Sequence, residues 1–271
     1  MKQLTRDGVR LAYEERGVGG DALLFIHGLG FDHTTFTPQI AHFERWQRVV
    51  AVDLRGHGAS DAPRQDYTMQ VLAEDVAWLS EQLNIERPVV VGHSMGGNVA
   101  LTLAALYPDL PSSITLIDSL LFPSLEMRVM LEELGKALER ANLGEVRGKV
   151  EPLFFLPSDD AALRGEMTAV FSRASQHVLH SAFVQHTVMY DAATFTAACR
   201  VPVAYIGSAK PLADLAALRS AIPEVVIAQT LGSGHFSPVM VPDQINAMIA
   251  RFITYAAATN SLQPQYNNRS V

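Results

Sequence analysis

The stretch Gly92-His93-Ser94-Met95-Gly96-Gly97 decides the fold that we expect for this chain. It follows the apolar run 88–91, which predicts a strand, and it precedes residues 98–107, which predict a helix ended by Pro108. Glycines at the flanks of so sharp a turn avoid clashes between a Cβ atom and nearby backbone. The turn lifts Ser94 to the carboxyl edge of a sheet, where helix N-terminal amides favour a developing anion. The pattern predicts a nucleophilic serine.

Short apolar runs ended by turn residues recur on both sides of this motif and predict further strands, at residues 22–26, 48–52, 113–118, 202–206 and 224–231. Helical patterns separate several of them, including one that follows Thr68, a predicted N-cap. Strands that alternate with helices indicate an α/β fold with a mostly parallel sheet flanked by helices.

The alternation breaks between residues 119 and 199, where several helical patterns follow one another. We therefore expect a helical cap at 119–199, inserted into a core domain formed by residues 1–118 and 200–258. A last helix is predicted from about Val241 to Ala257. Residues 259–271 are polar and aperiodic, and we expect them to form a mobile tail.

Composition excludes several classes of protein. The chain of 271 residues has 21 basic and 28 acidic side chains and a net charge of −7, which argues against a nucleic-acid partner. The one cysteine, Cys199, permits neither an intrachain disulfide nor a multi-cysteine metal site. No signal-peptide core and no apolar run near the roughly 20 residues of a membrane span is present in the sequence. We expect a cytoplasmic protein whose partner is a small-molecule substrate, and the oligomeric state stays open.

Two other glycine-containing segments follow predicted strands. In His27-Gly28-Leu29-Gly30 the backbone can approach a substrate oxygen, so the amides of Leu29 and Met95 are predicted to form an oxyanion hole. In Gly232-Ser233-Gly234-His235-Phe236, late in the chain, His235 is the histidine best placed to act as the base that a serine nucleophile needs.

The histidines of the insertion are His177, His180 and His186. The first two are three residues apart and can share a helix face, but the third lies half a turn away from that face. Their spacing therefore does not bring three ligands together. We expect no metal site and no cofactor, and we assign these side chains to the cap surface or the pocket wall.

The order of these segments resembles that of the α/β-hydrolase superfamily, in the branch of small esterases, enol-lactonases, cofactor-free haloperoxidases and carbon–carbon bond hydrolases. The motif around Ser94, the loop 27–30, the segment 53–60 and the late Gly234-His235-Phe236 carry the resemblance, which covers about residues 20–257. It implies that Ser94 is the nucleophile, that His235 is the base, and that residues 53–60 form a structural turn near the rim of the site.

The acid of the triad departs from the usual family pattern. Relatives commonly place an aspartate soon after the strand that is here 203–206, but this chain has Lys210 and its neighbours there, and Asp214 comes several residues late. A minority of the superfamily takes the acid from the strand after the nucleophile helix, a position held here by Asp118. We favour Asp118, with Asp214 as the alternative, as the carboxylate that orients His235.

These features predict a serine-dependent hydrolase that cleaves a carboxylic ester or lactone through an acyl-enzyme. The bulky apolar residues of the insertion and of the late loop predict a pocket for a small hydrophobic substrate, formed by Phe122, Met127, Phe154, Phe155, Phe183 and Phe236. Alternatives on the same fold are a carbon–carbon bond hydrolase, a cofactor-free ring-cleaving dioxygenase in which the His–Asp pair is the base, and a non-enzymatic ligand sensor.

Overall fold

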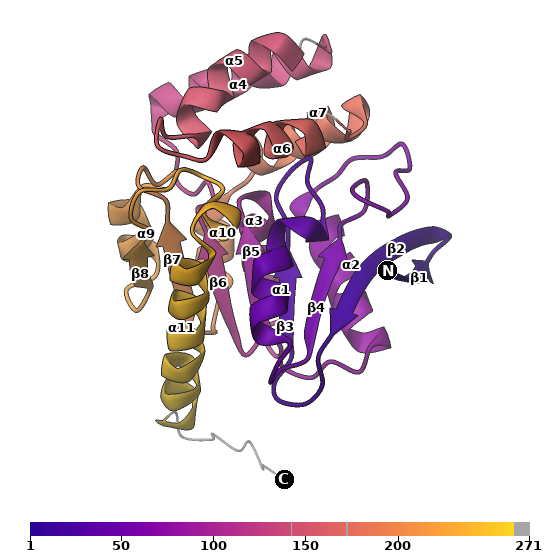
Figure 1. Ribbon diagram of the computed structural model, residues 1–271, viewed down its shortest axis with the longest axis vertical. Helices are drawn as coiled ribbons and strands as arrows, with labels where there is room; N and C mark the ends of the chain where they lie inside the picture. Colours follow the sequence, from indigo (N-terminus) through magenta and orange to yellow (C-terminus); the bar gives the residue numbers. More distant parts are fainter. Residues whose placement is uncertain (142, 172, 263–271) are drawn as a thin grey trace.

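The computed structural model describes residues 1–141, 143–171 and 173–262. A single sheet runs through the molecule with the strand order β1-β2-β4-β3-β5-β6-β7-β8 (Figure 1). The strands are β1 (Lys2–Arg6), β2 (Val9–Arg16), β3 (Leu23–Ile26), β4 (Val49–Asp53), β5 (Val89–His93), β6 (Ser113–Ile117), β7 (Val203–Gly207) and β8 (Val226–Gln229). The pairs β1–β2 and β2–β4 are antiparallel, and all other neighbours are parallel.

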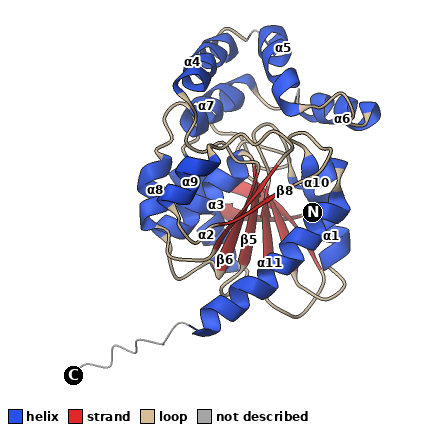
Figure 2. Ribbon diagram, turned by 90° about the vertical axis from the view of Figure 1, so that its left-hand side faces the viewer, coloured by secondary structure: helices blue, strands red, loops and turns tan. Residues whose placement is uncertain are grey.

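Helices cover both faces of the sheet (Figure 2). One face packs against α1 (Thr37–Phe43) and α11 (Pro242–Leu262), next to the short η1 (His33–Phe36) and α10 (Ser237–Met240). The other face packs against α2 (Met69–Gln82) and α3 (Met95–Leu106), with α8 (Ala192–Ala198) and α9 (Leu215–Ala221) beside them. Successive residues of a strand point to opposite faces, so β3 sends Leu23 and Phe25 into one core cluster and Leu24 and Ile26 into the other.

Four helices of the insertion lie above the carboxyl ends of the parallel strands (Figures 1 and 2). They are α4 (Leu125–Glu139), α5 (Leu143–Phe154), α6 (Ala161–Phe171) and α7 (Gln176–Thr187). The fifth helix of the insertion, α8, packs against α3 at the side of the sheet. The division into a core of 1–118 and 200–258 and a cap of 119–199 stays a proposal, and the packing of α8 favours a cap that ends before this helix.

The α/β class and the mostly parallel sheet are confirmed, and each predicted strand coincides with an observed one to within about two residues at either end. The antiparallel hairpin β1–β2 was not among the predicted strands. The last helix continues to Leu262 instead of ending near Ala257, so the first residues of the expected mobile tail are helical; the remainder, 263–271, lies outside the described residues. Within the described part of the chain, no helix has both the length and the apolar character needed to cross a membrane.

Candidate active site

Ser94 occupies a strained turn between β5 and α3. Its backbone has φ 54° and ψ −122°, a conformation that non-glycine residues rarely adopt, and its amide donates to the Ile117 carbonyl oxygen at 2.8 Å. The glycines of the motif permit this turn, because a Cβ on Gly92 would lie 2.1 Å from the Gly96 carbonyl oxygen and one on Gly96 would lie 2.0 Å from that of Ile26. The structure thus places Ser94 as the sequence predicts, at the carboxyl edge of the sheet.

The loop after β3 lies directly against this turn. A Cβ on Gly28 would be 3.1 Å from the Cβ of Ser94, a tight contact that glycine at this position avoids. Buried His27 stabilises the loop: its Nδ1 donates to the Gly28 carbonyl oxygen at 2.7 Å, and its Nε2 accepts from the Leu54 amide at 3.0 Å. Among the described residues, neither the Leu29 nor the Met95 amide has a backbone or side-chain acceptor, so both amides are free to bind an oxyanion.

His235 and Asp118 form a buried hydrogen-bonded pair. The Nδ1 of His235 lies 2.8 Å from Oδ2 of Asp118, and the two side chains are 3% and 1% exposed. Asp118 follows β6 directly with φ 45°, which turns its side chain along the sheet edge toward the loop after β8. Because a carboxylate only accepts, Nδ1 carries the proton and Nε2 of the neutral imidazole is left with a lone pair.

Three further donors hold the other oxygen of Asp118. Oδ1 accepts from the Ser208 amide at 3.1 Å, the Leu212 amide at 3.3 Å and the Tyr205 hydroxyl at 3.5 Å. Burial acts to raise the pKa of Asp118, but the hydrogen bond from His235 and the amides outweigh it, and the pKa lies below its usual value. Asp118 is therefore an anion at neutral pH, as the partner of a histidine base must be.

Asp214, the alternative acid, lies elsewhere. It is exposed and caps the N-terminus of α9, where its Oδ1 accepts from the Ala216 and Ala217 amides at 2.9 and 3.0 Å. The structure therefore brings Asp118, and not Asp214, to His235.

The backbone of His235 is held from two sides by residues to which the sequence analysis gave no such role. Its amide donates to the Phe154 carbonyl oxygen of the cap at 2.6 Å, and its carbonyl oxygen accepts from Nε2 of His93 at 2.9 Å. The neighbouring Gly234 amide donates to the buried carboxylate of Asp159, at 3.2 and 3.3 Å from its two oxygens. These bonds involve mostly main-chain atoms, which leave no pattern in a sequence.

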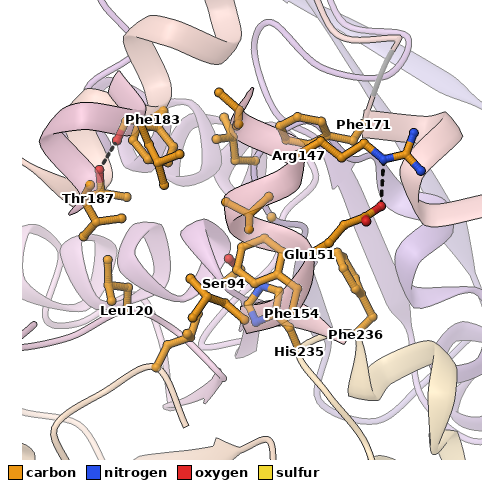
Figure 3. Close-up of a pocket in the computed structure, with 18 of the residues that line it drawn as sticks. Ser94, Leu120, Arg147, Glu151, Phe154, Phe171, Phe183, Thr187, His235 and Phe236 are labelled. Atoms are coloured by element: carbon orange, nitrogen blue, oxygen red, sulfur yellow. Dashed lines mark hydrogen bonds and ion pairs between the residues drawn. The ribbon is translucent and has the colours of Figure 1, made fainter. Parts of the chain in front are cut away.

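Ser94 and His235 both line a cavity of about 300 Å³ beneath the cap (Figure 3). In the described part of the chain Ser94 Oγ makes no hydrogen bond, and hydrogen bonds between a nucleophile and its base are often long or unformed in the absence of substrate. The phenyl ring of Phe154 stacks on the imidazole, with ring centroids 4.3 Å apart. This contact covers one face of the base with apolar surface.

The cavity is lined mainly by apolar side chains, and five of the six predicted pocket residues are among them: Met127, Phe154, Phe155, Phe183 and Phe236. Phe122 is not, and this expectation is corrected. The chain turns there with φ 54°, and Phe122 packs half-buried against the main core cluster instead. Helical periodicity identifies the apolar faces of the cap, but it does not give the direction of a side chain in a connecting turn.

Asp32, His33 and Asp53 bring three groups of metal-ligand type within 4.8 Å of one another. Their atoms are already engaged with the chain. Nδ1 and the amide of His33 both donate to Oδ1 of Asp53, at 2.7 and 2.8 Å, the Ala59 amide donates to Oδ2 of Asp53 at 2.8 Å, and Asp32 accepts from the Thr34 amide. We therefore assign the cluster a structural role in the turn 53–60.

Comparison with known proteins agrees with this geometry. The family model described as alpha/beta hydrolase fold matches residues 21–155. An uncharacterized protein of Mycobacterium tuberculosis is 40% identical over 115 residues, which are 42% of this chain and 33% of that protein. The 2-(acetamidomethylene)succinate hydrolase of Mesorhizobium japonicum is 37% identical over 110 residues, 41% of this chain and 39% of the enzyme. The matched region thus spans well under half the length of these relatives.

A solved structure extends the likeness to nearly the whole chain. The enol-lactonase from Burkholderia xenovorans LB400 superposes with a TM-score of 0.80 and 24% identity, covering 93% of this chain and all of that one. Identity at this level shows a shared fold only. Together with the family match, the strand order and the turn that carries Ser94, it shows that this chain belongs to the α/β-hydrolase family.

Proposed function

We propose that the protein is a serine hydrolase that cleaves carboxylic esters or lactones, with Ser94 as nucleophile, His235 as base and Asp118 as the orienting acid. The observation that carries this proposal is the buried Asp118–His235 hydrogen bond of 2.8 Å, in the same cavity as a serine on a strained turn. Fold alone does not imply function, and the proposal rests on the arrangement of these three side chains.

The reaction begins when Nε2 of His235 accepts the hydroxyl proton of Ser94 and Oγ attacks the substrate carbonyl carbon. The carbonyl oxygen becomes an oxyanion, which the Leu29 and Met95 amides stabilise. The imidazolium, held by the Asp118 carboxylate, then protonates the leaving alcohol oxygen as the C–O bond breaks. Water, deprotonated by His235, attacks the acyl-enzyme and releases the acid and free Ser94.

The apolar surroundings of Ser94 and His235 favour a neutral ester or lactone over a highly charged substrate. The cavity walls are largely aromatic and aliphatic, with Phe154 against the base and Leu120, Met127 and Phe183 further along the cavity. Water-poor surroundings strengthen the hydrogen bonds to an oxyanion and to the imidazolium. The enol-lactonase named above, which shares the fold, supports the choice of a lactone as one of the two substrate types.

The test is a turnover screen of aryl esters and lactones with the wild type, Ser94→Ala and a control, Ser220→Ala, which changes an exposed serine on α9. We expect Ser94→Ala to fold and to lose at least about 10³-fold in kcat, as removal of a triad nucleophile does. Ser220→Ala should keep the wild-type rate. A serine-directed phosphonate should label Ser94 alone.

Substantial activity in Ser94→Ala would overturn the acyl-enzyme mechanism. If Ser94→Ala lowers kcat less than about tenfold for the substrate that the wild type turns over best, His235 and Asp118 act as a base without a covalent step. Ring cleavage by a cofactor-free dioxygenase is a reaction of this kind. Absence of turnover with every ester and lactone would favour carbon–carbon bond hydrolysis or ligand sensing.

A further inference from the structure

One end of the cavity carries two polar side chains from the C-terminal turn of α7. His186 and Thr187 are each 7% exposed, and both line the cavity. Figure 3 shows Thr187 and Phe183 on one side of Ser94 and His235, and the Arg147–Glu151 ion pair on the other. Polar side chains therefore lie on both sides of Ser94 and His235 in the cavity: a histidine and a threonine on one side, and an ion pair on the other.

Both side chains donate a hydrogen bond to a backbone carbonyl oxygen of their own helix. Nδ1 of His186 lies 2.8 Å from the Ala182 carbonyl oxygen, and the Thr187 hydroxyl donates to the Phe183 carbonyl oxygen at 2.8 Å. A carbonyl oxygen can only accept, so the proton of the neutral imidazole is on Nδ1. Nε2 of His186 and Oγ1 of Thr187 are thereby left with lone pairs and no proton to donate.

Burial keeps the imidazole uncharged, since it lowers the pKa of His186 to about 4. Within the described residues no donor is bonded to Nε2 of His186, although the side chain is more than nine-tenths buried. The cavity lining is mainly apolar and includes Leu131, Leu134 and Phe183, and the ring of Phe183 lies with its centroid 5.9 Å from that of His186. An acceptor in a mainly apolar cavity wall has few polar partners, so a ligand that supplies a donor there gains a hydrogen bond in surroundings that strengthen it.

We propose that His186 and Thr187 form a subsite that binds a neutral hydrogen-bond donor of the substrate, a hydroxyl or an amide N–H, carried on an apolar chain. This inference rests on the proposed function and names its substrate class as hydroxylated or amide-bearing esters and lactones. A carboxylate is disfavoured because it would meet only lone pairs. An ammonium group is disfavoured because two neutral acceptors do not compensate its desolvation in an apolar wall.

The experiment compares matched pairs of nitrophenyl esters, ω-hydroxyalkanoates against alkanoates of the same length, over short and medium chains. A second series, acetates of α,ω-diols against acetates of 1-alkanols, covers binding on the leaving-group side. For the best-fitting length we expect the wild type to prefer the hydroxylated ester about tenfold in kcat/KM, the size expected of one neutral hydrogen bond, because a hydroxyl has one proton to donate.

His186→Phe replaces the acceptor by an apolar ring of similar size and should bring this preference to one or below. Thr187→Val, nearly isosteric, should reduce it in part and serves as an independent variant if His186→Phe does not fold. The control is His180→Phe, the same replacement on the same helix at a residue that does not line the cavity, which should keep the wild-type preference.

If wild type and His186→Phe show the same ratio, the subsite is refuted while ester hydrolysis stands. If no ester turns over, the proposed function fails, and the subsite is tested by binding alone. Calorimetric Kd values for an α,ω-diol and the matching 1-alkanol should then favour the diol in the wild type and not in His186→Phe. Equal ratios in the two proteins would refute the subsite in that case too.

Discussion

Replacing Asp118 by asparagine should disable the base without disturbing its position. The new amide has one oxygen and one NH₂ group, and the surroundings decide which way they point. The Ser208 and Leu212 amides both donate to the present Oδ1, so they will hold the amide oxygen there. The NH₂ group then faces Nδ1 of His235, which must accept, and the ring proton moves to Nε2.

The expected loss follows from this change of tautomer. With a proton on Nε2, His235 cannot accept the hydroxyl proton of Ser94, and the negative charge opposite the imidazolium is also absent. The same replacement in a known serine protease triad lowers kcat by about 10⁴. At about 1.4 kcal/mol for each tenfold change, this is a loss of about 5 kcal/mol in transition-state stabilisation. KM should change little, because Asp118 is buried and does not line the cavity.

The assay is steady-state hydrolysis of the best ester by the wild type, Asp118→Asn and Asp214→Asn, with thermal unfolding to confirm folding. Asp214→Asn should retain nearly full activity, because the Asp214 carboxylate is exposed and caps α9, it does not line the cavity, and asparagine caps helices as well as aspartate. A nearly active Asp118→Asn, or an inactive Asp214→Asn, would refute the assignment of the acid.

Two further predictions concern the cap and the pH dependence of stability. Asp159→Leu removes the acceptor of the Gly234 amide and should lower kcat about 10- to 100-fold with little change in KM. Asp159→Asn keeps one acceptor oxygen and should retain most of the wild-type rate. Equal rates for the two variants would contradict a positioning role for Asp159. Buried His186 has its pKa lowered from 6.5 to about 4, so the unfolded state binds more protons and this stability is lost as pH falls below about 6.5. Between about pH 7 and about pH 5, the free energy of unfolding measured with urea should therefore fall by about 2 kcal/mol more in the wild type than in His186→Phe. An equal fall in the two proteins would show that His186 takes up its proton in the folded protein.

The sequence was sufficient for the parallel part of the sheet and for the turn at Ser94. Strands buried on both faces, such as β5, are continuous apolar runs. The glycines around Ser94 are required because a Cβ on Gly92 or Gly96 would lie 2.1 or 2.0 Å from a backbone carbonyl oxygen. Asp118 could be predicted because its place at the end of β6 fixes its backbone at the same edge as the serine. These features are local in sequence and are repeated in many chains of this fold.

The hairpin β1–β2, which the sequence analysis did not predict, has a recognisable turn sequence. Asp7 and Gly8, with φ 49° and 81°, form the two-residue turn between β1 and β2, and Asp-Gly is a preferred pair for such turns. β1 is mostly polar and exposed, and the apolar buried part of β2 is only the three residues 11–13, so a search for longer apolar runs passes over both strands.

The contacts between cap and core had no comparable signal. The Phe154 carbonyl oxygen binds the His235 amide across 81 positions of sequence, and any residue at position 154 offers the same carbonyl. The pocket role of His186 likewise depends on which ring nitrogen the helix backbone occupies. Such features arise from the packing of separate elements, which periodicity does not determine.

In the proposed triad the acid is Asp118, directly after β6, so the loop after β7 supplies no side chain to the reaction. Its backbone amides still donate to Asp118, and the side chain of Lys210 is exposed two residues before Leu212, which lines the cavity. A Lys210→Cys variant would accept a thiol-reactive fluorophore at this point. Burial raises the pKa of Cys199, the native thiol, and so slows its labelling. The protein thus offers a position for an optical reporter of ligand entry that leaves its reacting groups intact.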